Sequence, residues 1–180
     1  MTEIQHLTVG SKDANITIEA FINFACPYCL NYFAAADEVL EPYINENKVQ
    51  YIVKHFDKTK QRLLKGTVAN IYLDYDDPEE TFKIIRYLYE TQDEWTLNFE
   101  TIERKMEHEL GLSPQKNADD RSLAIMQETF ERGIKGVPTV FINDEKFEFN
   151  PVEDDKETIQ EKLKSALESI WWSGENARNS

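Results

Sequence analysis

The chain has 180 residues, of which 41% are hydrophobic and 12% aromatic, and this content favours one globular domain over a disordered chain. Its formal net charge of −14 argues against nucleic-acid binding, because no basic patch on so acidic a surface could neutralise phosphates. No apolar run reaches the ~18 residues of a membrane-spanning helix, so we expect no membrane span.

The N-terminal residues before Ile16 have neither a basic start nor an apolar stretch, so the sequence as given shows no secretory signal. We therefore expect a cytoplasmic protein. Its 2 cysteines are too few for the disulfide framework of a small secreted domain. Because they are three residues apart, they indicate a redox pair, half a metal site or a coincidence.

The first third of the chain predicts a β–α–β unit. The apolar and partly β-branched residues Ile16–Phe24 are typical of a buried strand. A helical pattern follows, ends at Asn45–Lys48, and gives way to a second strand over Val49–Phe56. Such a unit implies two parallel strands joined by a right-handed crossover.

The next eighty residues predict a helical block. Apolar side chains recur with helical spacing, and Gly111 and Gly133 follow two of the segments as expected for helix C-caps. The predicted helices are Gln61–Leu73, Thr81–Glu94, Asn98–Leu110 and Asp119–Arg132.

The C-terminal part predicts a hairpin and a last helix. The strands Thr139–Ile142 and Lys146–Phe149 flank a polar turn. A helix over Asp154–Trp172 follows, and we expect Trp171 and Trp172 to pack at the end of the fold. The fold class is therefore α/β, in the order βαβ, helical block, ββα.

The motif Cys26-Pro27-Tyr28-Cys29 lies where the first strand meets the first helix. Pro27 suits the first helical turn, where its missing N–H would be unpaired in any case. Cys26 would then face the amides and the positive dipole end of the helix, which lower the pKa of a thiol. Cys29 would lie one turn further in, buried, and able to attack a mixed disulfide at an accessible Cys26.

A metal site is the weaker interpretation of this motif. Zinc usually takes four ligands, whereas Cys26 and Cys29 supply two, and His6, His55 and His108 show no ligand spacing. We therefore expect no metal and no cofactor. Tyr28 either tunes the pKa of the thiols or contacts the substrate, and both roles remain open.

A second motif, Gly136-Val137-Pro138-Thr139, opens the predicted hairpin. Proline at the start of a strand is tolerated at a sheet edge. X-Pro bonds are usually trans, but ahead of a buried strand in a chain with Cys-X-X-Cys a cis Val137–Pro138 bond is expected beside the sulfurs.

Together these motifs and the helical block between them resemble the DsbA-type thiol–disulfide oxidoreductases of the thioredoxin superfamily, over about residues 16–172. The resemblance implies a thioredoxin-like domain of residues 1–58 and 134–180, with residues 59–133 as an inserted helical subdomain. It implies that Cys26 is the nucleophile, that Cys29 resolves, and that Val137 and Pro138 bind substrate. The implied partners are protein or peptide thiols and disulfides, and a redox partner that recycles the pair.

Two rivals remain beside this hypothesis. One is a glutathione-linked transferase or isomerase of related fold, which would need no second thiol. The other is a non-catalytic adaptor on a thioredoxin-like frame, which would tolerate loss of either cysteine.

The chain departs from many relatives at one position. They carry a buried acid six residues before the first cysteine, where this sequence has Ala20. The neighbouring Glu19 should point to the other face of the sheet, because successive strand side chains alternate. We therefore expect water, or a group such as Lys54 on the second strand, to accept the proton of Cys29.

Overall fold

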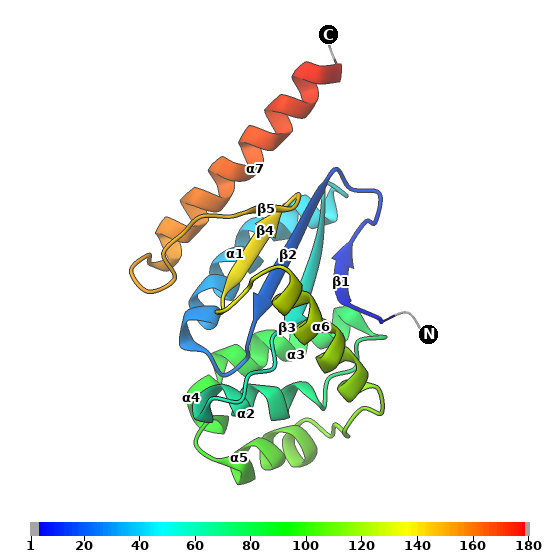
Figure 1. Ribbon diagram of the computed structural model, residues 1–180, viewed down its shortest axis with the longest axis vertical. Helices are drawn as coiled ribbons and strands as arrows, with labels where there is room; N and C mark the ends of the chain where they lie inside the picture. Colours follow the sequence, from blue (N-terminus) through cyan, green and yellow to red (C-terminus); the bar gives the residue numbers. More distant parts are fainter. Residues whose placement is uncertain (1–3, 179–180) are drawn as a thin grey trace.

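The computed structural model describes residues 4–178, and the side chains as far as residue 174. A five-stranded sheet in the order β1-β3-β2-β4-β5 forms its centre (Figure 1). Strands β2 (Ile16–Ile22) and β3 (Val49–His55) are parallel and are joined by helix α1 (Pro27–Asn45). The predicted β–α–β unit is therefore confirmed.

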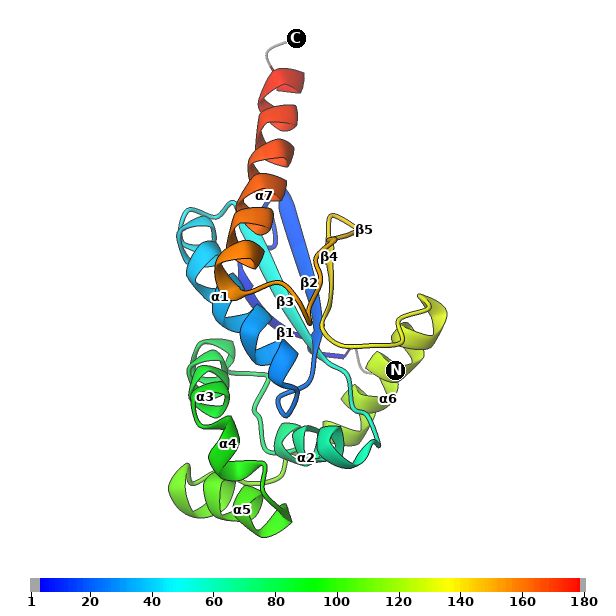
Figure 2. The ribbon, with the colours of Figure 1, turned by 90° about the vertical axis from the view of Figure 1, so that its left-hand side faces the viewer.

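The central strand β2 is covered on both faces. Ile18, Ala20 and Ile22 belong to the main core, which also contains apolar residues of α1 and of helix α7 (Lys156–Arg178). Phe21 points the other way and packs with Ile125 of helix α6 (Ala118–Glu131). Figures 1 and 2 show α1 and α7 on one side of the sheet and α6 on the other.

The predicted hairpin is present but its second strand is short. Strand β4 (Thr139–Ile142) pairs antiparallel with β2, and β5 is only Glu145–Lys146. The turn residues Asn143 and Asp144 have φ of 48° and 67°, as a two-residue type I′ turn requires. Past β5, Phe149 stacks on Tyr32 of α1 with ring centroids 5.7 Å apart, and this contact draws the chain off the sheet edge.

An edge strand was not predicted. Strand β1 (Leu7–Gly10) pairs antiparallel with β3, and Leu7 is fully buried. Its four residues are too few to show a clear alternation. Gly10 closes it with φ of +90°, and a Cβ there would lie 2.2 Å from the carbonyl oxygen of Val49, so the position requires glycine.

The helical block lies beyond the end of β2 from which the cysteine motif leaves the sheet (Figures 1 and 2). The helix predicted over Thr81–Glu94 is divided at Thr91, whose amide and hydroxyl both donate to the carbonyl of Tyr87 and end α3. The helix predicted over Asn98–Leu110 is an α-helical turn followed by a π-helix. The elements are α2 (Gln61–Asn70), α3 (Pro78–Glu90), α4 (Gln92–Trp95), α5 (Phe99–Glu103) and η1 (Arg104–Glu109).

Both predicted glycine caps have the expected backbone. Gly111 and Gly133 have φ of +66° and +67°, the left-handed conformation that favours glycine after a helix. The division of the chain at residues 59 and 133 stays a prediction. Helix α6 lies inside the predicted insertion, yet it packs on the sheet itself.

Helix α7 runs past the end of the sheet (Figure 1). Its buried residues are Ile159, Leu163 and Leu167, spaced four apart along one face. Trp172 lies beyond the last of these and is 64% exposed, so the predicted packing is wrong for Trp172. Across the described residues, none of the helices combines the length and apolar character needed to cross a membrane.

Candidate active site

The loop of residues 23–26 carries the chain from β2 into the cysteine motif, and its N–H groups are all bonded inside the protein. The amide of Asn23 donates to Sγ of Cys29 over 3.4 Å, and the amide of Phe24 donates to Nε2 of His55 over 3.0 Å. The amides of Ala25 and Cys26 donate to the side chain and the carbonyl of Asn23, respectively.

The carbonyls of the same loop accept hydrogen bonds from the helical block. Arg62 of α2 donates to Ala25 over 3.2 Å, and the hydroxyl of Tyr89 of α3 donates to Asn23 over 3.2 Å. Gln92 of α4 donates to the carbonyls of Phe24, over 2.8 Å, and of Cys26, over 3.1 Å. Since buried polar groups cost free energy when unpaired, these bonds fix the loop in one conformation.

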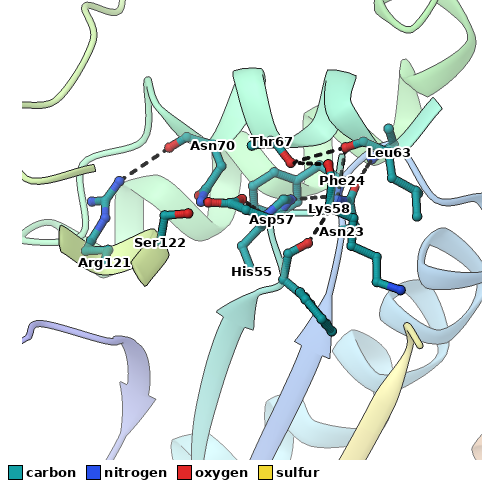
Figure 3. Close-up of polar contacts among 12 residues, drawn as sticks. Asn23, Phe24, His55, Asp57, Lys58, Leu63, Thr67, Asn70, Arg121 and Ser122 are labelled. Carbon is teal, nitrogen blue, oxygen red and sulfur yellow. Dashed lines mark hydrogen bonds and ion pairs between the residues drawn. The ribbon is translucent and has the colours of Figure 1, made fainter. Parts of the chain in front are cut away.

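The Asn23 side chain anchors this loop to the segment that follows β3. Its Nδ2 donates to the carbonyls of Phe56 and Leu63, each over 3.1 Å (Figure 3). Gly66 of α2 passes so close that a Cβ there would lie 2.0 Å from Oδ1 of Asn23. Only glycine therefore fits at this crossing.

The loop of residues 23–26 is also bonded to a buried polar network that begins at His55 (Figure 3). His55 is fully buried, and its Nδ1 lies 2.7 Å from Oδ1 of Asp57. Because Nε2 accepts from Phe24, the ring proton belongs on Nδ1. Burial opposes ionisation of Asp57, but its hydrogen bond with His55 keeps the carboxyl pKa below the ordinary value. Asn70 and Tyr75 continue the network.

The sequence did not identify this network. It offered His55 only as a possible metal ligand, and the spacing to Asp57 at the end of a strand is not specific. Among the described residues, no three His, Cys, Asp or Glu side chains are grouped as metal ligands would be.

Cys26 occupies the N-cap of α1 and Pro27 its first turn, as expected. Both cysteines are free thiols. A hydrogen bond from the Cys29 thiol, amides of the first turn and the charge of Arg62 outweigh burial and lower the pKa of Cys26 to about 6. Burial, and the hydrogen bond with Cys26, raise the pKa of Cys29 well above the ordinary thiol value.

The expectation of an accessible Cys26 is wrong. Cys29 is fully buried, as predicted, but Cys26 is itself only 4% exposed. The hydrogen bonds from Arg62 and Gln92 draw the loop inward, and the exposed residues of the motif are Pro27 and Tyr28, of which Tyr28 is 44% exposed. Exposure suits contact of Tyr28 with substrate, but its role stays a prediction.

A groove of about 510 Å³ opens beside the second motif. The Val137–Pro138 bond is cis, the geometry expected from the sequence. Val137 packs against the core cluster that contains both cysteines, and Thr139 pairs with Phe21 of β2. The groove thus lies at the cysteine end of the sheet. Direct contact between Pro138 and Cys26 stays a prediction, as does binding of substrate by Val137 and Pro138.

The proton acceptor for Cys29 is not Lys54. Nζ of Lys54 lies 2.6 Å from Glu19 and 2.7 Å from Glu128 of α6, on the sheet face opposite the main core. Ala20 faces the main core with Cys29, so the predicted alternation of Glu19 and Ala20 is confirmed. Lys54 was a wrong candidate because β3 turns its side chain to the same face as Glu19. Water remains the predicted acceptor.

The sheet, the thiol pair at the start of α1 and the cis-proline before β4 define a dithiol protein of the thioredoxin class. A family model described as thioredoxin matches residues 2–168, and the chain belongs to this family.

The curated relatives it matches are longer proteins. Two of them, from Rickettsia bellii and Rickettsia felis, are named "Putative protein-disulfide oxidoreductase" and are 26% and 29% identical over 100 and 90 residues. These matches take in 51% and 49% of this chain and 35% and 31% of the relatives. The chain therefore aligns with about a third of each relative.

Solved structures share the fold over almost the whole chain. A conserved protein of unknown function from Enterococcus faecalis is 33% identical, with a TM-score of 0.81, covering 91% of this chain and 90% of that one. BdbD from Bacillus subtilis is 14% identical with a TM-score of 0.65, covering 92% of each chain. Wolbachia pipientis alpha-DsbA1 is 17% identical with a TM-score of 0.69, covering 96% and 94%. The fold is therefore that of DsbA-type proteins, as predicted.

Proposed function

We propose that the protein is a thiol–disulfide oxidoreductase that exchanges disulfides with protein or peptide substrates through Cys26 and Cys29. One observation carries the proposal. Two free thiols lie one helical turn apart at the start of α1, and the interaction between them lowers the pKa of Cys26 to about 6 while burial raises that of Cys29. Only the thiolate is the nucleophile, so Cys26 can attack at neutral pH, whereas Cys29 stays a protonated thiol until the resolving step.

The exchange proceeds in two displacements. The Cys26 thiolate attacks one sulfur of a substrate disulfide, that bond breaks, and the departing thiolate takes a proton. Cys29 then loses its proton and attacks the Cys26 sulfur, which releases the second substrate thiol and leaves a Cys26–Cys29 disulfide. The substrate has gained two electrons and two protons, and the protein has lost them. The reverse sequence oxidises a substrate dithiol.

Substrate access explains the role of the groove. Because Cys26 is only 4% exposed, we infer that its substrate is an extended segment, which would lie along the cis-proline groove, rather than a large folded surface. The names of the rickettsial relatives support protein disulfides as substrates.

Replacement of Cys29 by serine tests the proposal and both rivals. An exchange enzyme lacking the resolving thiol should accumulate a covalent mixed disulfide at Cys26, which non-reducing electrophoresis and mass spectrometry detect. Cys26→Ser should form none. A glutathione-linked enzyme would keep full activity in Cys29→Ser, and an adaptor would form no covalent species in either variant. Either result would overturn the proposal.

We also propose a cytoplasmic location, where the pair would be mostly reduced and would act as a reductase or isomerase. The reduction potential of the Cys26–Cys29 pair tests the direction. A value near about −270 mV, as in thioredoxin, supports a reductase, and a value near about −120 mV, as in DsbA, would point to an oxidase.

A further inference from the structure

Positive charge gathers around the candidate active site of this acidic protein. Five cations form what we call the basic rim: Lys58, Lys60, Arg62, Lys135 and Lys146. They come from the segment after β3, the start of α2, the loop before Pro138 and strand β5. The whole chain, in contrast, has a formal net charge of −14.

Two contacts connect this rim to the loops of the site. Nε of Arg62 donates to the carbonyl of Ala25, and the Arg62 charge favours the thiolate of Cys26. Nζ of Lys58 donates to the carbonyl of Lys135 over 2.6 Å, so Lys58 bridges the segment after β3 and the loop that precedes the cis-proline. Burial and the neighbouring charge of Lys60 lower the pKa of Lys58, and the charges of the two thiols oppose that shift.

The remaining part of the rim lies along the groove beside the cis-proline. Lys135 and Lys146 line it and are exposed. Of the described residues that line it, none is acidic, and the third cation there, Arg132, is neutralised by Glu19 and Glu128.

The rim cations also lack carboxylate partners of their own. Elsewhere, cations such as Arg86, Lys105 and Lys156 are paired with carboxylates. Within the described part of the chain, none of the five rim cations has such a pair, and Lys58 and Arg62 use backbone carbonyls instead. Unpaired charges of one sign beside a concave site attract ligands of the opposite sign and raise their association rate.

We propose that the basic rim selects peptide segments with carboxylates next to the disulfide cysteine, so that acidic peptides are the preferred substrates. This inference rests on the proposed exchange activity. A segment lying along the groove would bring its flanking side chains to Lys135 and Lys146 on one side of Cys26. Its carboxylates on the other side would meet Lys60 and Arg62.

The test uses three peptide disulfides that are identical except for the residue next to the cysteine, which is Glu, Gln or Lys. Stopped-flow reduction by the dithiol protein gives a rate for each. The same rates with dithiothreitol, which also attacks as a thiolate but has no basic rim, correct for intrinsic reactivity and for repulsion between the attacking thiolate and the flanking charge. We expect the corrected rate for the Glu peptide to exceed that for the Lys peptide by about tenfold at about 0.01 M salt. The ratio should approach one at about 1 M salt, where the screening length is about 3 Å.

Matched variants distinguish the effect of the basic rim on this rate ratio from the effect of the protein's net charge. Lys135→Glu should reduce the Glu-to-Lys ratio about threefold, and Lys135→Glu with Lys146→Glu should bring it to one or below. Lys12→Glu makes the same charge change in the turn before β2, at the end of the strand remote from the cysteines. It should leave the ratio unchanged.

The outcomes distinguish the two proposals. Failure to reduce the Gln peptide would overturn the exchange activity and the inference together. Reduction of all three peptides at equal corrected rates, or a ratio that Lys12→Glu lowers as much as Lys135→Glu, would overturn the basic rim alone.

Discussion

Removing the Cys29 thiol should raise the pKa of Cys26. The hydrogen bond from Cys29 is the largest cause of the low Cys26 pKa, and bonds to charged groups contribute about 1.5–3 kcal/mol. At 1.36 kcal/mol per unit, this corresponds to about 1–2 units, so the pKa in Cys29→Ala should rise from about 6 to about 7–8. The thiolate fraction at pH 7 would fall from about nine-tenths to between about one-half and one-tenth.

The assay is the pH dependence of iodoacetamide labelling at Cys26, and the midpoint of the profile is the quantity to compare. A single rate is less informative, because thiolate nucleophilicity rises with pKa and offsets part of the loss. Cys29→Ser keeps an O–H donor and should shift the midpoint less than Cys29→Ala. A midpoint that stays near 6 in Cys29→Ala would refute the reasoning and assign the low pKa to the helix amides and Arg62.

Three further predictions concern the surroundings of the pair. Gly66→Ala should destabilise the protein by about 1–3 kcal/mol in urea unfolding, because the new Cβ meets Asn23, whereas Gly174→Ala, with nothing within 4 Å, should not. His55→Phe should cost about 1–3 kcal/mol by leaving the Phe24 amide unpaired, and a smaller loss in His55→Gln, which keeps an acceptor, is the matched check. Burial opposes ionisation of Glu19, but hydrogen bonds from Lys54 and Arg132 lower the pKa of its carboxyl group. The Glu19 carboxylate therefore stabilises the fold above its unfolded pKa of about 4.3, and this stability is lost as the pH falls through the lower folded pKa. Glu19→Gln should flatten that dependence of stability on pH. Glu19→Ala should change the rate at which Cys29 resolves the mixed disulfide by less than about threefold, or about 0.6 kcal/mol. A larger change would make Glu19 the proton acceptor.

The features that were predictable have local causes. The β–α–β unit follows from runs of apolar residues, and the place of Cys26 follows from Pro27 at a strand–helix junction. The opposite faces of Glu19 and Ala20 follow from the pleat of a strand. Each of these depends on a few neighbouring residues, and the sequence displays them directly.

The features that were missed depend on distant partners. Burial of Cys26 results from bonds made by Arg62 and Gln92, which lie 36 and 66 residues further along the chain. The side to which Lys54 turns depends on its pairing with β2 and on Glu128 of α6. No local pattern marks Arg62, Gln92 or Glu128 as partners of the site, so only the folded chain identifies them.

The pairing of β4 with β2 bears on how the site assembles. Ile18 pairs with Ile142, so the centre of the sheet joins segments from near both ends of the chain. Contacts of such long sequence separation are costly in loop entropy and form slowly. During synthesis both thiols emerge well before the strand that completes their side of the sheet. The nascent chain therefore carries its cysteines for a time without the cis-proline groove, and the proposed selective exchange would begin only when the C-terminal quarter has been added.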